Sequence, residues 1–338
     1  MWSASAWPAQ GGPRASRVRH SGLQSKAYGR RGDVLAAARS IAIEHSLDTE
    51  WVEITLAQAR FVPNVAQLIM PNATPAARDW SAYRARFVEP RRIEAGARWW
   101  RDNEAWLGLV EERFGVPPDI VVGIVGVETY FGRITGGFRV LDALATLSFD
   151  FPSGRSNRSG FFRSELGQFL SLARREGWDA TSVMGSYAGA MGLPQFMPSS
   201  VLNYAIDFDE DGRIDLANSS ADVIGSVARF LVEHGWRRGM PTHYAIEPPT
   251  DIVERALLLV PDIVPSFSPA QMVERGARLD ETALQHEGSL ALIELLNAEA
   301  PPSYVAGTQN FYALTRYNAS SYYALAVIEL GRAVGAVH

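Results

Sequence analysis

The chain has 338 residues, of which 47% are hydrophobic and 20% charged, and it carries a formal net charge of −5 with a pI near 5.8. This length predicts more than one structural unit, and the acidic balance argues against a protein that binds nucleic acid. The sequence contains no cysteine, which excludes disulfides, thiol catalysis, zinc–thiolate sites and a lipid-anchoring cysteine. It has no run of eighteen apolar residues, so no transmembrane segment is expected.

The first 31 residues differ in composition from everything that follows. They include Arg14, Arg17 and Arg19 but no acidic residue, and they are rich in Ser, Gly and Ala. An Arg- and Ser-rich start superficially resembles an organelle transit peptide, but no apolar stretch typical of a secretory signal peptide is present. We predict that residues 1–31 form a disordered tail, or that they reflect a misassigned start.

Helical patterns begin at Asp33, where an acid precedes a run of good helix formers. Prolines at several positions then divide the chain into short helical pieces. We expect one long amphipathic helix over residues 91–114, with apolar positions recurring at helical spacing. The segment 115–118, Gly-Val-Pro-Pro, ends that helix and opens the next.

The next segment, residues 120–127, has no polar side chain, and Glu128 follows it directly. Such a run predicts a buried helix or strand, and Gly123 and Gly126 favour a helix packed closely on a neighbour. Burial disfavours the carboxylate and raises the pKa, which suits a general acid. The alternative is a Glu that caps the helix end or forms an ion pair there, for example with Arg133.

Further helices are expected at residues 141–147, with Asp142 as their cap, and at residues 165–175, with a polar loop at 155–160 between them. After Gly239 the pattern becomes β-rich and bounded by proline. We expect short strands around 244–246, 257–260, 263–266 and 309–315, and a strand or helix at 289–296. A core helix follows at residues 321–334.

An acidic segment, Asp207-Phe-Asp-Glu-Asp-Gly-Arg-Ile-Asp215, matches the first nine places of an EF-hand calcium loop. Asp207, Asp209 and Asp211 hold places one, three and five, and Gly212 supplies the turn at place six. Arg213 would offer its backbone carbonyl and Asp215 stands at place nine. Asn218 replaces the Glu of place twelve, although Asp222 could close a longer loop. The alternative is a solvated acidic turn.

Several motifs together resemble the membrane-bound lytic murein transglycosylase B family, glycoside hydrolase family 103, here without a lipid-anchor cysteine. They are V-G-V-E-T-Y-F-G-R around Glu128, L-D-A-L-A-T-L-S-F at 141–149 and G-S-Y-A-G-A-M-G-L-P-Q-F-M-P-S-S at 185–200. The acidic loop, I-G-S-V-A at 224–228 and R-Y-N at 316–318 are similar too. The similarity runs from about Trp51 to Val334.

The resemblance implies a mainly α (α+β) fold: a lysozyme-like helical core with an added α-domain, an EF-hand-like calcium loop and a small β-domain. The expected division is a tail at 1–31, an α-domain at 32–100, the catalytic core at 101–239, a β-containing domain at 240–310 and a C-terminal core helix at 311–338. It implies a lytic transglycosylase that cleaves the β-1,4 bond between N-acetylmuramic acid and N-acetylglucosamine in peptidoglycan and leaves a 1,6-anhydro end.

The resemblance also assigns roles to single residues. Glu128 acts as the only catalytic residue, first as acid and then as base, while a bound Ca²⁺ is structural and no organic cofactor is used. The implied substrate-binding residues are Ser186, Gln195, Tyr83, Tyr317, Asn318, Phe161 and Phe230. Phe161 and Phe230 stand where the family pattern leads us to expect tyrosine, which puts the hydrogen bonds of those positions in doubt.

Two other functions stay open from the residues themselves. A lysozyme-type hydrolase would need a second carboxylate or a positioned water, and Asp142 and Asp150 are the nearest acids downstream of Glu128. A non-catalytic, calcium-dependent peptidoglycan-binding protein would not need the acid. The expected partners are peptidoglycan glycan strands, not nucleic acid, and the expected location is the periplasm, although the chain shows no signal peptide.

Overall fold

The computed structural model describes residues 27–29, 31–70, 78–154 and 156–338. The predicted tail therefore lies almost wholly outside the described residues, as does Arg155 of the predicted polar loop. The described chain is mostly helical with small antiparallel sheets, as the sequence predicts. None of the described helices is long and apolar enough to cross a membrane.

The N-terminal part is built from short helices that proline and acidic caps delimit. These are α1 (Gly32–Glu44), α2 (Thr49–Ala57), α3 (Pro63–Leu68), α4 (Trp80–Phe87), α5 (Pro90–Asp102) and α6 (Glu104–Phe114). The single helix predicted over 91–114 is wrong, because the chain breaks at Asn103. Its side-chain Nδ2 donates to the Trp99 carbonyl (2.8 Å), a local bond that competes with the regular helical pattern.

The central part carries the long apolar run on a helix. It contains α7 (Pro118–Thr129), β1 (Phe138–Arg139), α8 (Val140–Phe149), α9 (Ser159–Glu176), β2 (Met184–Gly185), α10 (Pro198–Tyr204) and α11 (Ser220–Glu233). Asp142 is not the cap of α8, as the sequence suggested, but lies in its first turn. Its carboxylate accepts the Arg60 backbone N–H (2.9 Å) and pairs with Arg139 (3.4 Å).

A four-stranded antiparallel sheet of order β4-β3-β6-β5 dominates the part after Gly239. Its elements are β3 (His243–Glu247), α12 (Ile252–Leu259), α13 (Pro269–Glu274), β4 (Arg278–Leu279), α14 (Glu281–Leu284), β5 (Ala291–Asn297) and β6 (Ala300–Gly307). The segment 289–296, for which strand and helix stayed open, contains most of the strand β5. Residues 257–259 belong to α12 instead of a strand, and residues 263–266 form no strand. The Asp251 carboxylate starts α12 by accepting the Val253 N–H (2.7 Å), and this cap outweighs the strand-like composition.

The C-terminal part is helical, with α15 (Gln309–Tyr317) and α16 (Ser321–Gly335). The strand predicted at 309–315 is therefore wrong. The Thr308 hydroxyl caps α15 by accepting the Asn310 N–H (3.1 Å), and Phe311 and Leu314, three residues apart, bury one face of the helix.

Helices α7 and α16 are in close contact although about 200 residues separate them in sequence. A Cβ on Gly123 would lie 2.2 Å from the Val327 carbonyl oxygen, and one on Gly331 would lie 2.0 Å from the Asp119 carbonyl oxygen. Only glycine allows backbones to approach this closely. The prediction that Gly123 favours close helix packing is confirmed.

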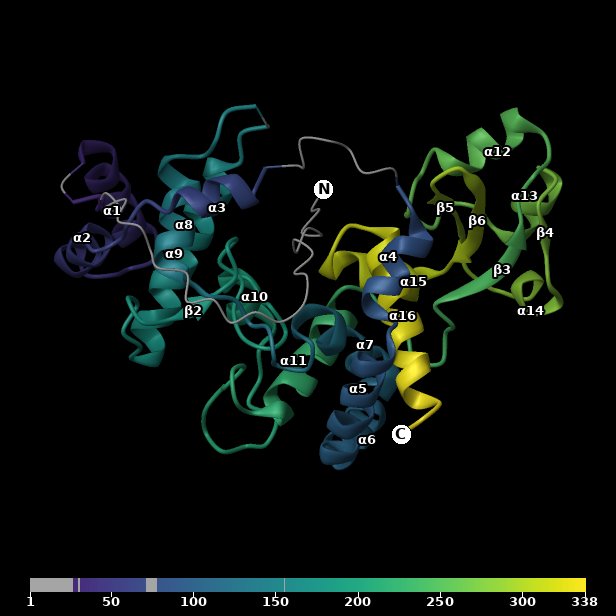
Figure 1. Ribbon diagram of the computed structural model, residues 1–338, viewed down its shortest axis with the longest axis horizontal. Coiled ribbons are helices and arrows are strands. Elements are labelled where there is room, and N and C mark those ends of the chain that lie inside the picture. Colours follow the sequence, from purple (N-terminus) through teal and green to yellow (C-terminus); the bar gives the residue numbers. More distant parts are fainter. Residues whose placement is uncertain (1–26, 30, 71–77, 155) are drawn as a thin grey trace.

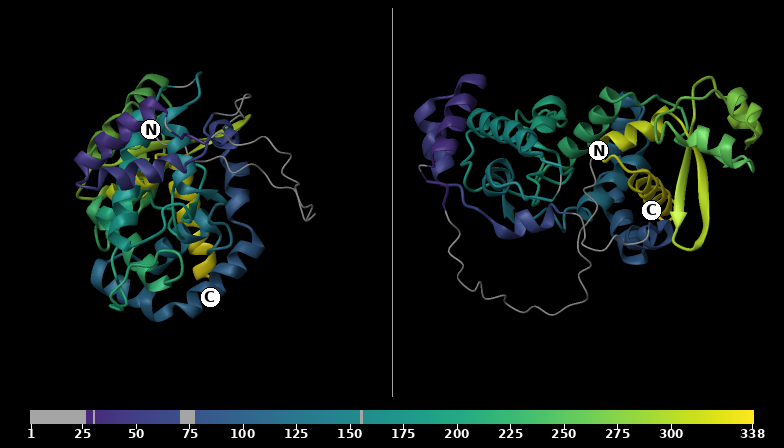
Figure 2. Two further views of the ribbon diagram at one scale, coloured as in Figure 1. Left: turned by 90° about the vertical axis from the view of Figure 1, so that its left-hand side faces the viewer. Right: turned by 90° about the horizontal axis from the view of Figure 1, so that it is seen from above.

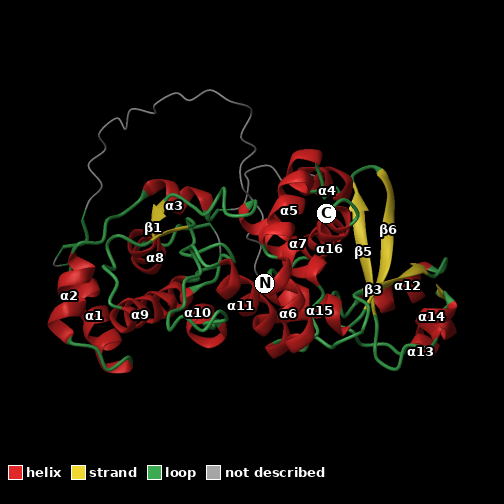
Figure 3. Ribbon diagram, turned by 90° about the horizontal axis from the view of Figure 1, so that it is seen from below, coloured by secondary structure: helices red, strands yellow, loops and turns green. Residues whose placement is uncertain are grey.

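The two helices stand in the middle of the molecule, between the α1, α2 and α9 end and the β-sheet end (Figure 1). The view from above and the view coloured by secondary structure show the same division, with β3, β5 and β6 gathered at one end (Figures 2 and 3). The larger hydrophobic core includes the fully buried Ile124, Leu144, Phe169 and Val327. A separate, smaller core around Leu258 and Leu292 supports the sheet.

Candidate active site

Glu128 lies in the last turn of α7, directly after the apolar run. Pro117 and Pro118 begin the helix, and Tyr130 ends it by adopting a left-handed conformation (φ 53°). Residues 120–127 are all buried, so Glu128 is the only charged side chain near the C-terminal end of the helix. The buried helix that the sequence predicted therefore carries one carboxyl at its end, as expected.

The surroundings of Glu128 favour its protonated form. Burial raises the pKa of the Glu128 carboxyl to about 7, while a hydrogen bond from the Tyr323 hydroxyl to Oε1 (2.7 Å) opposes this rise. Among the described residues, no carboxylate or cation shifts the pKa of this group. The alternative of an ion pair with Arg133 does not occur, because that guanidinium lies over the Tyr130 ring, 4.9 Å from its centroid.

Three tyrosines surround this carboxyl. Burial raises the pKa of Tyr83, Tyr317 and Tyr323, and the negative charge of Glu128 is the second cause in each case. The rings of Tyr317 and Tyr323 are stacked, with centroids 6.3 Å apart, and the Tyr317 hydroxyl donates to the Pro194 carbonyl (2.6 Å). The structure thus brings Tyr83 and Tyr317 to the catalytic candidate, as the family resemblance implied.

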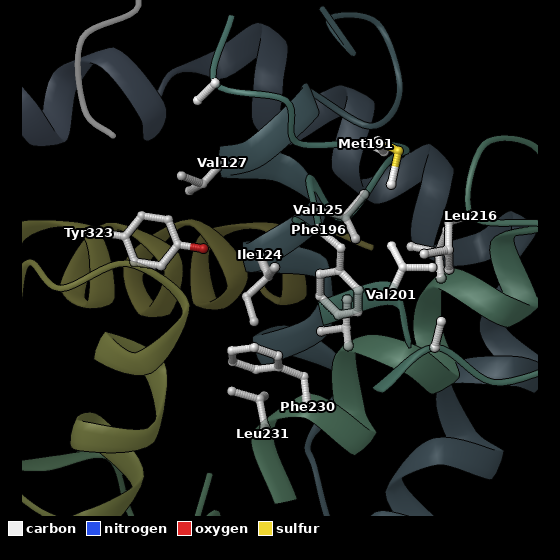
Figure 4. Packing of buried hydrophobic residues seen from close by; sticks show 14 of the residues in the cluster. Ile124, Val125, Val127, Met191, Phe196, Val201, Leu216, Phe230, Leu231 and Tyr323 are labelled. Atoms are coloured by element: carbon white, nitrogen blue, oxygen red, sulfur yellow. The ribbon is translucent and has the colours of Figure 1, made fainter. Parts of the chain in front are cut away.

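Tyr323 is the residue that the sequence analysis missed. It is 2% exposed and comes from the first turn of α16. Figure 4 shows its hydroxyl oxygen pointing toward the side chains of α7. A hydroxyl-bearing side chain at the start of an otherwise apolar core helix could have indicated this role, but only the packing of α16 on α7 identifies its partner.

Phe230 and Phe161 occupy different settings. Phe230 is 6% exposed and packs between Phe196 and the ring of His234, so it belongs to the core that Figure 4 shows. Phe161 is half-buried at the start of α9, edge-on to Phe162 and under the Arg158 guanidinium (4.8 Å). Neither ring has a described contact with Glu128.

The segment 185–196 forms a compact turn beside α7. The Ser186 hydroxyl accepts the backbone N–H groups of Ala188 (3.3 Å) and Ala190 (3.0 Å). Gln195 has a left-handed backbone (φ 51°), and its side-chain amide donates to the Thr135 carbonyl (3.1 Å). Both side chains are thus engaged in holding this turn. Asn318 differs, because its buried Oδ1 has no hydrogen-bond partner among the described residues and could accept one from a ligand.

The same turn connects α7 with the acidic loop, residues 207–222. The Thr129 hydroxyl donates to the Leu193 carbonyl (3.1 Å), and the Leu193 N–H donates to the Leu216 carbonyl (2.8 Å). A chain of two hydrogen bonds therefore links the residue after Glu128 to the acidic loop.

The acidic loop gathers three carboxylates around one point. One oxygen from each of Asp207, Asp209 and Asp211 lies within 4.8 Å of the others, and Gly212 makes the turn with φ 91°. The loop backbone already donates to them: the Asp207 carboxylate accepts the N–H groups of Asp211 (3.1 Å) and Gly212 (2.8 Å). A group of three oxygens on a tight loop fits a hard cation such as Ca²⁺.

The other predicted ligands of the loop differ in position. The Asp215 carboxylate accepts the backbone and side-chain N–H groups of Asn218. Asp222 is 1% exposed and spans the loop, since its two oxygens accept the N–H groups of Phe208 (2.8 Å) and Asp215 (2.7 Å). Asp222 thus closes the loop through backbone hydrogen bonds, and its expected role as a cation ligand stays a prediction. Asp215 and Asp222 lie outside the three-carboxylate group, and Arg213 exposes most of its side chain.

A cavity of about 770 Å³ lies next to the acidic loop and does not include Glu128. Its walls include Trp178 and Asp179 after α9, Leu193 of the 185–196 turn and residues 213–218 of the loop. Gly132 and Thr135 line it as well, so the turn that follows Glu128 forms part of its wall. The cavity is therefore distinct from the group of tyrosines around Glu128.

Comparison with known proteins gives consistent matches over nearly the whole chain. The family model for the transglycosylase SLT domain matches residues 31–332. The membrane-bound lytic murein transglycosylase B of Escherichia coli (strain K12) is 37% identical over 302 residues, which cover 86% of this chain and 79% of that protein.

Solved structures agree with these matches. The soluble lytic transglycosylase SltB1 from Pseudomonas aeruginosa superposes with a TM-score of 0.81 at 36% identity, covering 90% of this chain and 98% of that chain. The Escherichia coli lytic transglycosylase Slt35 in complex with calcium superposes with a TM-score of 0.80 at 35% identity, covering 94% of this chain and 97% of that chain. The lysozyme-like fold expected from the sequence is thereby confirmed.

Proposed function

The chain belongs to the lytic murein transglycosylase B family and is a peptidoglycan lytic transglycosylase, and from this premise we propose that Glu128 is its single catalytic acid and base. The observation that carries the proposal is one buried carboxyl, with a pKa of about 7, whose described hydrogen-bond partner is the Tyr323 hydroxyl. A group with this pKa is protonated in a large fraction of molecules near neutral pH and can also accept a proton, which a residue with both roles requires.

In the first step, protonated Glu128 gives its proton to the oxygen of the β-1,4 bond that leaves C1 of N-acetylmuramic acid. The C1–O bond breaks, and the departing N-acetylglucosamine keeps the proton on its new 4-hydroxyl. In the second step, the Glu128 carboxylate takes the proton of the C6 hydroxyl of the same muramyl residue while O6 bonds to C1. A 1,6-anhydro end forms, Glu128 is protonated again, and no water is consumed.

Two features of the site favour this route over hydrolysis. The acids that could have served as a second carboxylate are engaged elsewhere, Asp142 with Arg60 and Arg139, and Asp150 with Arg31. An intramolecular hydroxyl also has a proximity advantage over water. Tyr83, Tyr317, Asn318 and Gln195 would offer flat apolar faces and hydrogen-bonding groups to the sugars, and Ser186 would keep its turn in place.

The acidic loop would hold a structural Ca²⁺ through Asp207, Asp209 and Asp211, with Arg213 adding its backbone carbonyl. Support comes from the convergence of the three carboxylate oxygens and from the calcium complex of Slt35. The ion would neutralise repelling charges and fix the loop, and no catalytic step requires it. The periplasm would be the working compartment, because glycan strands of peptidoglycan are found there.

Mass spectrometry of digested peptidoglycan tests the proposal. The wild-type enzyme should release muropeptides with 1,6-anhydro ends, each lighter by one water than the product of hydrolysis, and Glu128→Gln should release almost none. Products of hydrolysis would assign the protein to lysozyme-type chemistry instead. Turnover by Glu128→Gln above a few per cent of the wild-type rate would remove Glu128 from the catalytic role.

A further inference from the structure

The backbone that follows Glu128 takes an unusual path. Tyr130 and Phe131 both adopt left-handed conformations (φ 53° and 56°), and Gly132 continues with φ 83°. Side-chain-bearing residues rarely adopt this conformation, and two in succession are rarer still. Local preference therefore does not hold this turn in place, and contacts from other elements must do so.

Arg92, on α5, makes one of these contacts. Its Nη1 donates to the Gly126 carbonyl oxygen (2.7 Å), which also accepts the N–H of the left-handed Tyr130 (3.2 Å). The guanidinium carbon lies 4.5 Å from the Tyr130 ring centroid and 5.2 Å from that of Phe87. A positive charge at the C-terminal end of a helix is favourable, and so is its position against aromatic rings.

One turn further along α5, Gly96 receives the other left-handed residue. A Cβ on Gly96 would lie 2.8 Å from Cζ of Phe131, so the ring fits against α5 only because this position is glycine. Arg92 and Gly96 are four residues apart and share one face of the helix. This face of α5 thus contacts both left-handed residues that follow the catalytic carboxyl.

Placing a charged guanidinium in this partly buried position costs folding free energy. Arg92 is half-buried, and its Nε has no hydrogen-bond partner among the described residues. The charge of Glu89 acts on the guanidinium, but Arg92 forms no ion pair in the part of the chain that the structure describes. Burial disfavours the charged guanidinium and thereby lowers the pKa of Arg92. An apolar side chain of similar length could pack on Phe87 and Tyr130 without this cost. What the cation adds is the strong hydrogen bond to the Gly126 carbonyl, together with its favourable position at the helix end and against the two rings.

We infer that Arg92 is a positioning residue for Glu128: it holds the Gly126 carbonyl and the Tyr130 ring so that the last turn of α7 directs the Glu128 carboxyl to the Tyr323 hydroxyl. Arg92 touches neither the carboxyl nor the tyrosine hydroxyl and acts through the backbone. This inference rests on the proposed catalytic role of Glu128.

The test compares Arg92→Met, Arg92→Lys and the control Arg98→Met. Arg98 lies on the same helix but is about half exposed and pairs with Glu94 (2.6 Å), so its replacement should leave kcat within about twofold of wild type. Arg92→Met should lower kcat on a soluble, uncross-linked glycan fragment about ten- to a hundredfold with KM changed less than about twofold, because misplacement of a catalytic group slows chemistry more than binding. Arg92→Lys retains the charge and a hydrogen-bond donor, so its kcat should be at least about threefold higher than that of Arg92→Met.

The inference is overturned if Arg92→Met retains wild-type kcat well below its melting temperature, even when that temperature falls, because Arg92 would then only stabilise the fold. A loss confined to KM, or a Lys variant no better than Met, would overturn it as well. Should Arg92→Met not fold, Arg92→Leu, which also lacks a hydrogen-bond donor, takes its place, and wild-type kcat in that variant is equally decisive. Failure of the wild-type enzyme to produce anhydro ends would instead count against the proposed function.

Discussion

Glu128 and the acidic loop at 207–222 show two opposite environments for carboxyl groups within one chain. Glu128 stands alone at the end of a buried helix, and its described hydrogen-bond partner is one tyrosine hydroxyl. In the loop, Asp207, Asp209 and Asp211 lie within a few ångströms of each other, and backbone N–H groups donate to them.

The comparison shows that solvation and donors, more than residue type, decide whether a carboxyl keeps its proton. Burial raises the pKa of Glu128 to about 7, because the single donor, the Tyr323 hydroxyl, only partly opposes it. At Asp215, by contrast, hydrogen bonds from Asn218 and Ala217 outweigh burial, so the pKa of that carboxyl falls below its ordinary value. One region can therefore supply protons, and the other can supply negative charge to a cation.

The largest expected effect comes from Glu128→Gln. Turnover should fall about a thousandfold, because the amide cannot give a proton. The free energy of unfolding, by contrast, should increase at alkaline pH. The folded-state pKa of about 7 exceeds the unfolded value of about 4.3, so the stabilisation by the bound proton is complete below the unfolded value and is lost as pH rises through 7.

Because Gln does not lose a proton, we expect Glu128→Gln to be more stable than wild type at pH 8 by about 1 to 3 kcal/mol and nearly equal to it at pH 4. Denaturant unfolding of both proteins at the two pH values measures this difference. Equal stability at pH 8 would mean that the carboxyl is well solvated, and the contrast between the two regions would not hold.

Tyr323→Phe sharpens the comparison by removing the single donor of the buried carboxyl. The hydrogen bond lowers the pKa of Glu128, so its loss should raise that pKa and move the alkaline limb of the pH–rate profile to higher pH. We expect kcat to fall about tenfold, because the acid is also less well oriented. Tyr322→Phe is the matched control, since its hydroxyl donates to the Leu296 carbonyl instead (2.9 Å). An unmoved alkaline limb in Tyr323→Phe would contradict the assignment.

Addition and removal of Ca²⁺ test the acidic loop at 207–222. At a concentration about a hundredfold above its dissociation constant, Ca²⁺ should stabilise the native state by about 2 to 3 kcal/mol, and Mg²⁺ by less. Asp209→Ala should abolish the effect, whereas Glu210→Ala, at the neighbouring position outside the three-carboxylate group, should retain it. Thermal melts with and without chelator measure this. A chelated enzyme that melts normally but is inactive would show that the ion does more than stabilise the fold.

The smallest effect is expected at the turn that joins the two regions. Ser186→Ala leaves the Ala188 and Ala190 N–H groups without their acceptor and should destabilise the fold by about 1 kcal/mol. Gln195→Ala removes the bond to the Thr135 carbonyl and should cost less, because that side chain is only half-buried. Rates measured well below both melting temperatures separate substrate binding from stability, and a rate loss that exceeds the unfolded fraction would favour the binding role.

Much of this arrangement can be predicted from the sequence, but the contacts that complete it cannot. The apolar run predicts a buried helix with Glu128 at its end, and the Asp spacing predicts the acidic loop. Nothing in the chain order indicates that Tyr323 meets Glu128, because 195 residues separate them and only tertiary packing joins them. The strands expected at 257–260 and 309–315 are wrong for a related reason. In each case a single capping side chain, Asp251 or Thr308, starts a helix that the composition of the segment does not reveal.

The close packing of α16 on α7 has a consequence for the biosynthesis of the enzyme. Glycines at 123 and 331 allow the two backbones to meet, and the ribosome makes α16 after α7 and after every element that lies between them. Until Tyr323 has been synthesised and α16 has docked, Glu128 lacks its hydrogen-bond donor and α7 lacks the surface that buries it. A growing chain that has not yet reached residue 323 therefore lacks this contact, and under the proposed role of Glu128 it would not cut cell wall.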